Sequence, residues 1–80
     1  MTTPALIQFI SHFEAAIDGI EPGSISGETE LRSIRVWDSI ALLCVLAMSD
    51  TEYGVTLTGA DVGQCRTVAD IHQLILSKRG

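Results

Sequence analysis

The sequence predicts an all-α protein: a four-helix bundle with a long first loop and a short third helix. Apolar residues recur at helical spacing in the first, second and last parts of the chain. Residues that favour helix starts precede these segments, and glycines follow them. Between residues 19 and 37 no period persists, which indicates a loop. Eighty residues suffice for one domain with a modest core, so we expect a single domain over residues 1–80.

The first helix has a marked start and a marked end. Thr3 is a candidate N-cap, and Pro4 occupies the first helical position, where its missing N–H costs nothing. Glycine and proline at residues 19–23 end the pattern. The apolar stripe predicted for the core is Leu6, Ile10, Phe13, Ile17 and Ile20.

The long loop is expected to be anchored rather than free. A loop of this length in a compact domain needs a structural or functional reason. Leu31, Ile34 and Trp37 are spaced so that they can insert into the core. We expect these side chains to hold the start of the next helix in place.

The second helix opens at Asp38-Ser39-Ile40 and runs to about Glu52, with Asp38 as its N-cap. It is apolar nearly all round, and a small domain cannot bury every face of one helix. We therefore expect an exposed apolar face that attracts a partner. The predicted core face is Leu42, Leu46, Ser49 and Tyr53, flanked by Val45. The predicted second face is Ile40, Cys44, Ala47 and Thr51, with Ala41 and Met48 beside it.

Two matching signals organise the last third of the chain. Gly54 is placed to end the second helix in the left-handed conformation. The segments Thr58 to Asp61 and Thr67 to Asp70 each pair a threonine N-cap with an acid three residues later, a variant of the capping box. They predict a short helical turn and a final helix. The core residues predicted for that final helix are Val68, Ile71, Leu74 and Ile75.

Composition excludes several classes of function. The net charge of -5, from ten acidic and five basic residues, argues against nucleic-acid binding, which needs clustered Lys and Arg. Two cysteines and two histidines without ligand spacing argue against a metal site. The first residues lack a basic segment that leads into an apolar run, so we expect no secretory signal. The longest apolar run, residues 40–48, is too short to cross a membrane. We expect a cytoplasmic protein.

Ser39 is the strongest candidate for a residue that carries a chemical group. It lies one position past the N-cap, where its hydroxyl faces solvent and an attached anion gains roughly 0.3–1 kcal/mol from the helix dipole. Asp-Ser at a helix start is also a common capping pair with no other role. The surrounding spacing distinguishes these interpretations: Val36-Trp37-Asp38-Ser39-Ile40, then Tyr53-Gly54-Val55, then Thr67-Val68-Ala69-Asp70-Ile71.

In these segments and their spacing the chain resembles the acyl carrier protein family over almost its full length. The resemblance implies a bundle of acyl-carrier type. It implies that a separate Mg²⁺-dependent phosphopantetheinyl transferase attaches 4′-phosphopantetheine to Ser39, next to the motif residue Asp38. The arm would hold acyl or aminoacyl groups as thioesters, and tethering would raise their effective concentration at each processing enzyme. The chain would act as a monomeric, stand-alone carrier and not as an enzyme.

The resemblance also indicates which residues meet these partners. Ile40, Ala47 and Asp50 match the docking helix of fatty-acid carriers, whereas Ala41, Cys44 and Thr51 replace acids found there. This departure predicts more apolar contacts than those of a typical fatty-acid synthase. Trp37, directly before Asp38-Ser39, is similar to carriers of specialised pathways, such as peptidyl, D-alanyl or polyketide carriers. Cys44 has two interpretations: a small hydrophobic residue of the helix, or an exposed thiol within the docking face. The predicted partner-binding residues are Trp37, Ile40, Ala41, Cys44, Ala47 and Met48.

Two other functions compete with the carrier interpretation. A serine hydrolase using Ser39 would need a base and an oxyanion hole, and the Gly-x-Ser-x-Gly elbow is absent from the sequence. An unmodified helical interaction module is the stronger alternative. It would dock through the apolar second face and leave Ser39 unmodified.

Overall fold

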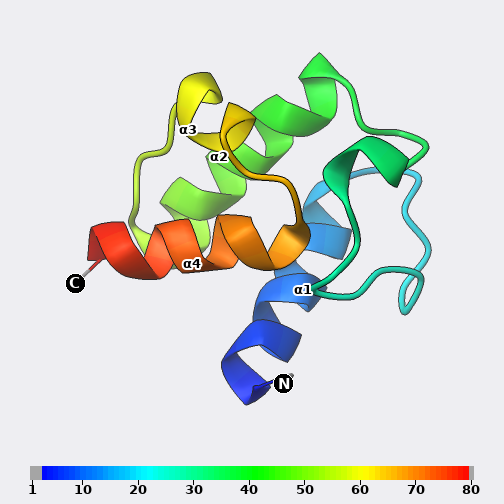
Figure 1. Ribbon diagram of the computed structural model, residues 1–80, viewed down its shortest axis with the longest axis horizontal. Coiled ribbons are helices and arrows are strands. Elements are labelled where there is room, and N and C mark those ends of the chain that lie inside the picture. The colour runs from blue at the N-terminus through cyan, green and yellow to red at the C-terminus, as the bar shows by residue number, and fades with distance from the viewer. Residues whose placement is uncertain (1–2, 80) are drawn as a thin grey trace.

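The computed structural model describes residues 3–79, and within them the chain is all-helical (Figure 1). No strand forms in this part of the chain; Glu30 and Thr67 make an isolated antiparallel bridge. The predicted fold class is therefore confirmed, including the long first loop and the short third helix. The elements are α1 (Pro4–Ala16), the 3-10 turn η1 (Leu31–Ser33), α2 (Ser39–Tyr53), α3 (Gly59–Gly63) and α4 (Val68–Arg79).

Helix α1 begins as predicted and ends earlier. The Thr3 hydroxyl accepts a hydrogen bond from the Leu6 N–H at 3.1 Å, and Pro4 is the first helical residue. The helix stops at Ala16, so Ile17 and Ile20 lie beyond it rather than on its stripe. Their predicted place in the core is nevertheless confirmed, because Ile17 is buried and Ile20 packs against the core. Phe9 and Phe13 are the fully buried residues of α1, because the face between α2 and α4 is centred on them.

Helix α2 is capped as predicted, but its core face differs. Asp38 Oδ1 accepts a hydrogen bond from the Ala41 N–H at 2.8 Å, and Gly54 ends the helix with a φ of 66°. The predicted core residues Leu42 and Leu46 are only half-buried. The predicted core residue Ser49 and the flanking Val45 are buried, as expected. The structure also buries Ala41 and Met48, which were predicted for the second face, so the buried side of the helix is rotated toward them.

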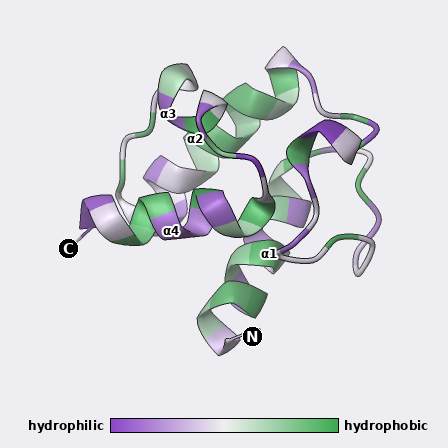
Figure 2. Ribbon diagram, in the orientation of Figure 1, coloured by the Kyte–Doolittle hydropathy of each residue, from purple (hydrophilic) through white to green (hydrophobic). Residues whose placement is uncertain are grey.

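This rotation has a physical reason. Polar residues gather toward the C-terminal end of α2, and the rest of the helix is apolar on most sides (Figure 2). An apolar pattern that surrounds a helix does not specify which side is buried. Contacts with α1, α3 and α4 decide it instead.

Both threonine caps form as predicted. Thr58 and Asp61 make a reciprocal capping box, with hydrogen bonds of 2.9 and 3.1 Å. Thr67 and Asp70 repeat it, at 3.0 and 3.2 Å. On α4 the predicted core residues Val68, Ile71 and Ile75 are buried and Leu74 is half-buried, and the structure adds a buried histidine, His72.

The long loop is anchored by side chains and by its backbone. Leu31 and Ile34 are buried, as predicted, and the Trp37 ring stacks on Phe13 with ring centres 6.1 Å apart. Three backbone hydrogen bonds also join the loop to the start of α4. They run from Ala69 N to Gly27 O, from Val68 N to Thr29 O, and from Leu31 N to Arg66 O, at 2.8–3.1 Å.

None of the helices in the described residues has the length and apolarity required to cross a membrane.

Candidate functional site

Ser39 is the first residue of α2, and its side chain is exposed. Its neighbour Asp38 performs the capping, by accepting the hydrogen bond from the Ala41 N–H. Ser39 therefore lies at the positive end of the helix without being the residue that caps it. An anion attached to its hydroxyl would be stabilised by that end of the helix dipole. The exposed hydroxyl and the helix end together suit a phosphodiester.

The segment before Ser39 is held firmly. The Trp37 N–H donates to the Ile34 carbonyl oxygen at 3.0 Å, and Ile34 is buried. The Trp37 ring lies nearly parallel to Phe13 of α1, at 15°. These contacts anchor the loop immediately before α2, so Ser39 follows a packed segment rather than a free loop.

Beyond Ser39, α2 presents a narrow exposed apolar surface. Ile40 is 69% exposed, Leu43 is 63% exposed, and Ala47 is also exposed. Their spacing of three and four residues places them on one side of the helix. We call Ile40, Leu43 and Ala47 the outer stripe. The prediction of an exposed apolar face is confirmed.

The membership of that face requires correction. Ala41 and Met48 were predicted to contact partners, but both are buried in the core, because α2 is rotated relative to the prediction. Leu43 was missed, although it lies three residues after Ile40 and that spacing marks it as a neighbour. Cys44 is half-buried and lines a shallow groove between α1 and α2. Trp37 is half-buried through its contact with Phe13.

A larger groove borders the N-terminal turn of α2. Its volume is about 570 Å³, and it lies between η1, the start of α2, and α3. Trp37 and Leu42, which flank Ser39 in the sequence, both line it. We call it the α2–α3 groove and define it by the apolar Trp37, Leu42 and Val62 and the charged Glu30, Arg32 and Arg66. Sequence reasoning did not find it, because its walls come from three separate segments.

A polar cluster of His12, Glu52 and Tyr53 lies where α1, α2 and α4 meet. The Tyr53 hydroxyl is 3.1 Å from His12 Nδ1, and His12 Nε2 is 3.6 Å from Glu52 Oε1. Tyr53 was predicted for the core face of the second helix, and the structure leaves it half-buried with its hydroxyl paired to His12. Burial and the nearby Glu52 carboxylate raise the pKa of Tyr53. The described residues hold no group of three or more possible metal ligands.

No family model matches the chain, and no solved structure matches it. The chain is similar to the orsellinic acid synthase of Beauveria bassiana (strain ARSEF 2860), with 29% identity over 66 residues. This match covers 82% of the chain but only 3% of that synthase. The similarity is therefore to one small part of a much longer protein.

Proposed function

We propose that this chain is a carrier domain that holds acyl intermediates as thioesters on a 4′-phosphopantetheine arm attached to Ser39. The observation that carries the proposal is an exposed serine on the first turn of a helix that a different residue, Asp38, already caps. The resemblance of the sequence around Ser39 to acyl carrier proteins supports the proposal. So does the match to a synthase, because a shared small module would match most of this chain and little of a long synthase.

In the attachment reaction, Ser39 Oγ forms a new bond to the phosphorus of coenzyme A that bears the pantetheine group. The bond between that phosphorus and the bridging oxygen breaks, and adenosine bisphosphate leaves. The serine proton passes to a base on the transferase. This chain supplies an accessible nucleophile and a helix end that favours the resulting negative charge. Once attached, the thiol of the arm activates acyl groups as thioesters for transfer and condensation.

The outer stripe is proposed as the docking surface for the transferase and for the enzymes that load and process the acyl group. It combines large exposed apolar side chains with Asp50, which is exposed farther along α2. Exposed apolar residues grouped on one side of a helix are typical of interaction sites. The small number of acids on α2 favours largely apolar contacts, and hence partners of a specialised biosynthetic pathway.

The attachment is tested by mass spectrometry. Incubation with coenzyme A, Mg²⁺ and a broad-specificity phosphopantetheinyl transferase should add the mass of one phosphopantetheine. Ser39→Ala should abolish the gain, whereas Ser11→Ala, at an exposed serine of α1, should retain it. A wild-type chain that gains no mass, or a Ser39→Ala chain that still gains it, would show that the proposal is wrong.

An unmodified interaction module remains the second candidate, and the exposure of Ile40 and Leu43 favours it. Such a module would bind a partner through the outer stripe without any mass gain on Ser39. The two candidates therefore differ in the same mass measurement.

A further inference from the structure

Trp37 occupies a distinctive position relative to Ser39. It directly precedes the N-cap Asp38, and it is the only tryptophan of the chain. A hydrophobic residue before an N-cap often pairs with the fourth residue of the helix, here Leu42, and such a pair fixes the angle at which the chain enters the helix. Trp37 and Leu42 are both half-buried and both pack against the core. The entry to α2 thus has apolar support in addition to the cap that Asp38 makes.

The Trp37 ring also reaches a helix that is distant in the sequence. It lies nearly parallel to the ring of Phe13 in α1, with ring centres 6.1 Å apart and planes at 15°. Phe13 is fully buried, and close packing keeps such a side chain in place. The Trp37 N–H donates to the carbonyl oxygen of the buried Ile34 at 3.0 Å. Both the ring and the backbone of Trp37 are therefore tied to buried residues.

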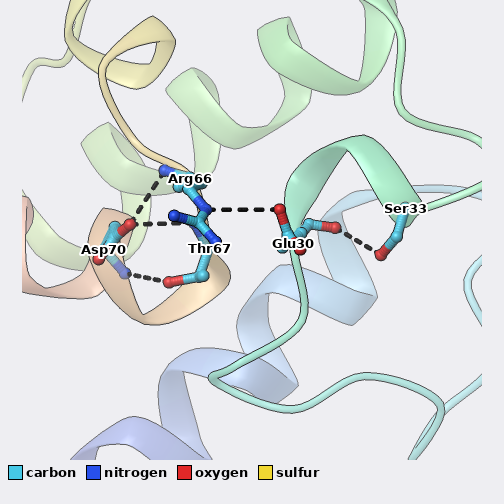
Figure 3. Close-up of polar contacts among 5 residues, drawn as sticks. All are labelled: Glu30, Ser33, Arg66, Thr67 and Asp70. Carbon is cyan, nitrogen blue, oxygen red and sulfur yellow. Dashed lines mark hydrogen bonds and ion pairs between the residues drawn. The ribbon is translucent and has the colours of Figure 1, made fainter.

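The turn that leads to Trp37 is itself held in place (Figure 3). Ser33 Oγ donates a hydrogen bond to the Glu30 carbonyl oxygen at 2.7 Å, and Arg66 Nε lies 3.4 Å from Glu30 Oε1. Leu31 N donates to the Arg66 carbonyl oxygen at 2.9 Å, which joins η1 to the residues before α4. The support for the entry to α2 thus extends from α1 through η1 to the start of α4.

Attachment of the arm depends on where the Ser39 hydroxyl lies. Its oxygen must approach the phosphorus of coenzyme A roughly in line with the bond that breaks. A displacement of the reacting atoms by a single ångström can lower the rate about 100-fold. Ser39 is exposed in the first turn of α2, and helix ends fray. Contacts that fix the entry to the helix therefore also fix the position of this hydroxyl.

We propose that Trp37 is a positioning residue for attachment of the phosphopantetheine arm: stacked on Phe13, it holds the entry to α2 so that the Ser39 hydroxyl is presented to the transferase. Trp37 acts through the backbone of the two residues that follow it and not by contact with the enzyme. This role differs from the one expected from the sequence, which placed Trp37 among the partner-binding residues. The inference rests on the proposed function, because positioning matters only if Ser39 accepts the arm.

The test separates positioning from contact through the steady-state kinetics of arm transfer. The kcat and the KM for the carrier are measured with coenzyme A, Mg²⁺ and a broad-specificity phosphopantetheinyl transferase. Trp37→Leu removes the flat ring and should lower kcat by about 10- to 100-fold with little change in KM. Trp37→Phe retains a ring that can stack on Phe13, so this conservative variant should recover most of the kcat.

Phe13→Leu breaks the same stack from its buried side. The transferase cannot touch Phe13, which is fully buried, yet this variant should reproduce the loss of kcat. Because Trp37 is the only tryptophan, its fluorescence emission should move to longer wavelength as its ring becomes more exposed. Circular dichroism checks that the helices are retained. Ile40→Ala, at an exposed residue of the outer stripe, should instead raise KM and retain kcat.

Ile75→Val controls for a general loss of stability. Ile75 is fully buried in α4, outside the stack of Trp37 on Phe13, and removal of a methylene there weakens core packing. At a temperature where the parent and the variant are both folded, Ile75→Val should keep the kcat of the parent. A loss of kcat as large as that of Trp37→Leu would assign the effect to stability and overturn the inference.

The remaining outcomes distinguish this inference from the proposed function. If the parent chain takes up no arm at Ser39, the carrier function and the positioning role both fail. If the parent is loaded and Trp37→Leu keeps its kcat or raises only KM, the positioning role is wrong and the carrier function stands. The same conclusion follows if Phe13→Leu shifts the emission of Trp37 and leaves kcat unchanged.

Discussion

At the scale of single residues, the start of α2 shows a division of roles: Asp38 caps the helix, and the Ser39 hydroxyl takes no part in the cap. The Asp38 carboxylate accepts the N–H of Ala41 at 2.8 Å, so the helix start is satisfied without the Ser39 hydroxyl. Ser39 can therefore be modified without removal of a cap. The consequence is that the two residues should respond differently to substitution.

Asp38→Ala should lower the free energy of unfolding by about 0.5–2 kcal/mol, the usual cost of losing an N-cap. Ser39→Ala should change it by less than about 0.5 kcal/mol, as exposed substitutions without a structural role do. Urea unfolding measures both. Asp50→Ala, which removes an exposed acid of α2 that is not a cap, is the matched control. A larger loss for Ser39→Ala than for Asp38→Ala would contradict this division.

At the scale of elements, α2 is the helix whose orientation controls the site. Its buried side contains Met48, and its outer stripe contains Leu43. These residues have similar size and hydropathy but opposite environments. The sequence alone assigned Met48 to the partner surface and passed over Leu43.

Truncation of these two side chains should have opposite consequences. Met48→Ala removes buried packing and should cost about 2–5 kcal/mol of stability. Leu43→Ala should change stability by no more than about 0.5 kcal/mol and should weaken binding to the transferase. Denaturant unfolding and a binding titration measure the two effects. Equal losses of stability in both variants would refute the assigned orientation of α2.

The long loop depends on one glycine at its contact with α1 and α4. A Cβ atom at Gly27 would lie 2.8 Å from Leu6 Cδ2 and 3.4 Å from the Ala69 Cβ. Gly27 also accepts the hydrogen bond from Ala69 N, so the close approach is part of the anchored loop.

Gly27→Ala should therefore destabilise the fold by about 1 kcal/mol, at the low end for overpacking because the half-buried Leu6 side chain can shift. Gly63→Ala is the control, because a Cβ there meets nothing within 4 Å. That variant should be neutral or more stable by up to about 1 kcal/mol, since alanine favours a helix over glycine. Thermal unfolding would show the contrast, and a Gly27→Ala chain as stable as the parent would argue against tight packing of the loop.

At the scale of the whole molecule, an aromatic centre joins the three long helices. Phe9 of α1 packs against Tyr53 of α2 at a ring distance of 5.9 Å and stacks on His72 of α4 at 5.1 Å. Burial lowers the pKa of His72 from its ordinary value of 6.5. The folded chain therefore holds this imidazole in its neutral form.

The consequence is sensitivity to mild acid. The unfolded chain binds a proton at His72 more readily than the folded chain, so stability should fall as the pH drops below about 6.5. Hydrogen bonds to backbone N–H groups lower the pKa values of Asp61 and Asp70, mainly through Thr58 and Arg66 respectively. Their contribution is present above their ordinary pKa of 3.8 and is lost in a separate, more acidic range.

His72→Leu should flatten the dependence of unfolding free energy on pH between about 5 and 7, which is the range of histidine titration. His12→Gln, which retains His72, should keep the loss of stability in that range. Urea titrations at several pH values measure the slope. An unchanged slope in His72→Leu would show that another group is responsible.

Local signals predicted much of this structure. The caps Thr3, Asp38, Thr58 and Thr67 and the helix end at Gly54 were found because each depends on a few neighbouring residues. The anchoring of the loop by Leu31 and Ile34 was also predicted, from their spacing and hydropathy. The position of Ser39 as the first residue of α2 belongs to the same category, because it follows from the cap at Asp38.

Long-range packing decided the rest. The burial of Ala41 and Met48, the exposure of Leu43, and the pairing of His12 with Tyr53 require helices distant in sequence to meet. The α2–α3 groove likewise needs η1, α2 and α3 side by side. An all-round apolar helix carries no sequence signal for its rotation, so only the neighbouring elements select its buried side.

For this protein, the sequence by itself determined the helices, their caps and the serine that begins α2, since these depend on contacts within a few residues. The tertiary structure alone decided which side of α2 faces outward and which polar residues border the groove beside Ser39. The physical reason is that burial is a property of surfaces brought together, and an apolar residue such as Met48 or Leu43 can satisfy either environment until its neighbours are in place.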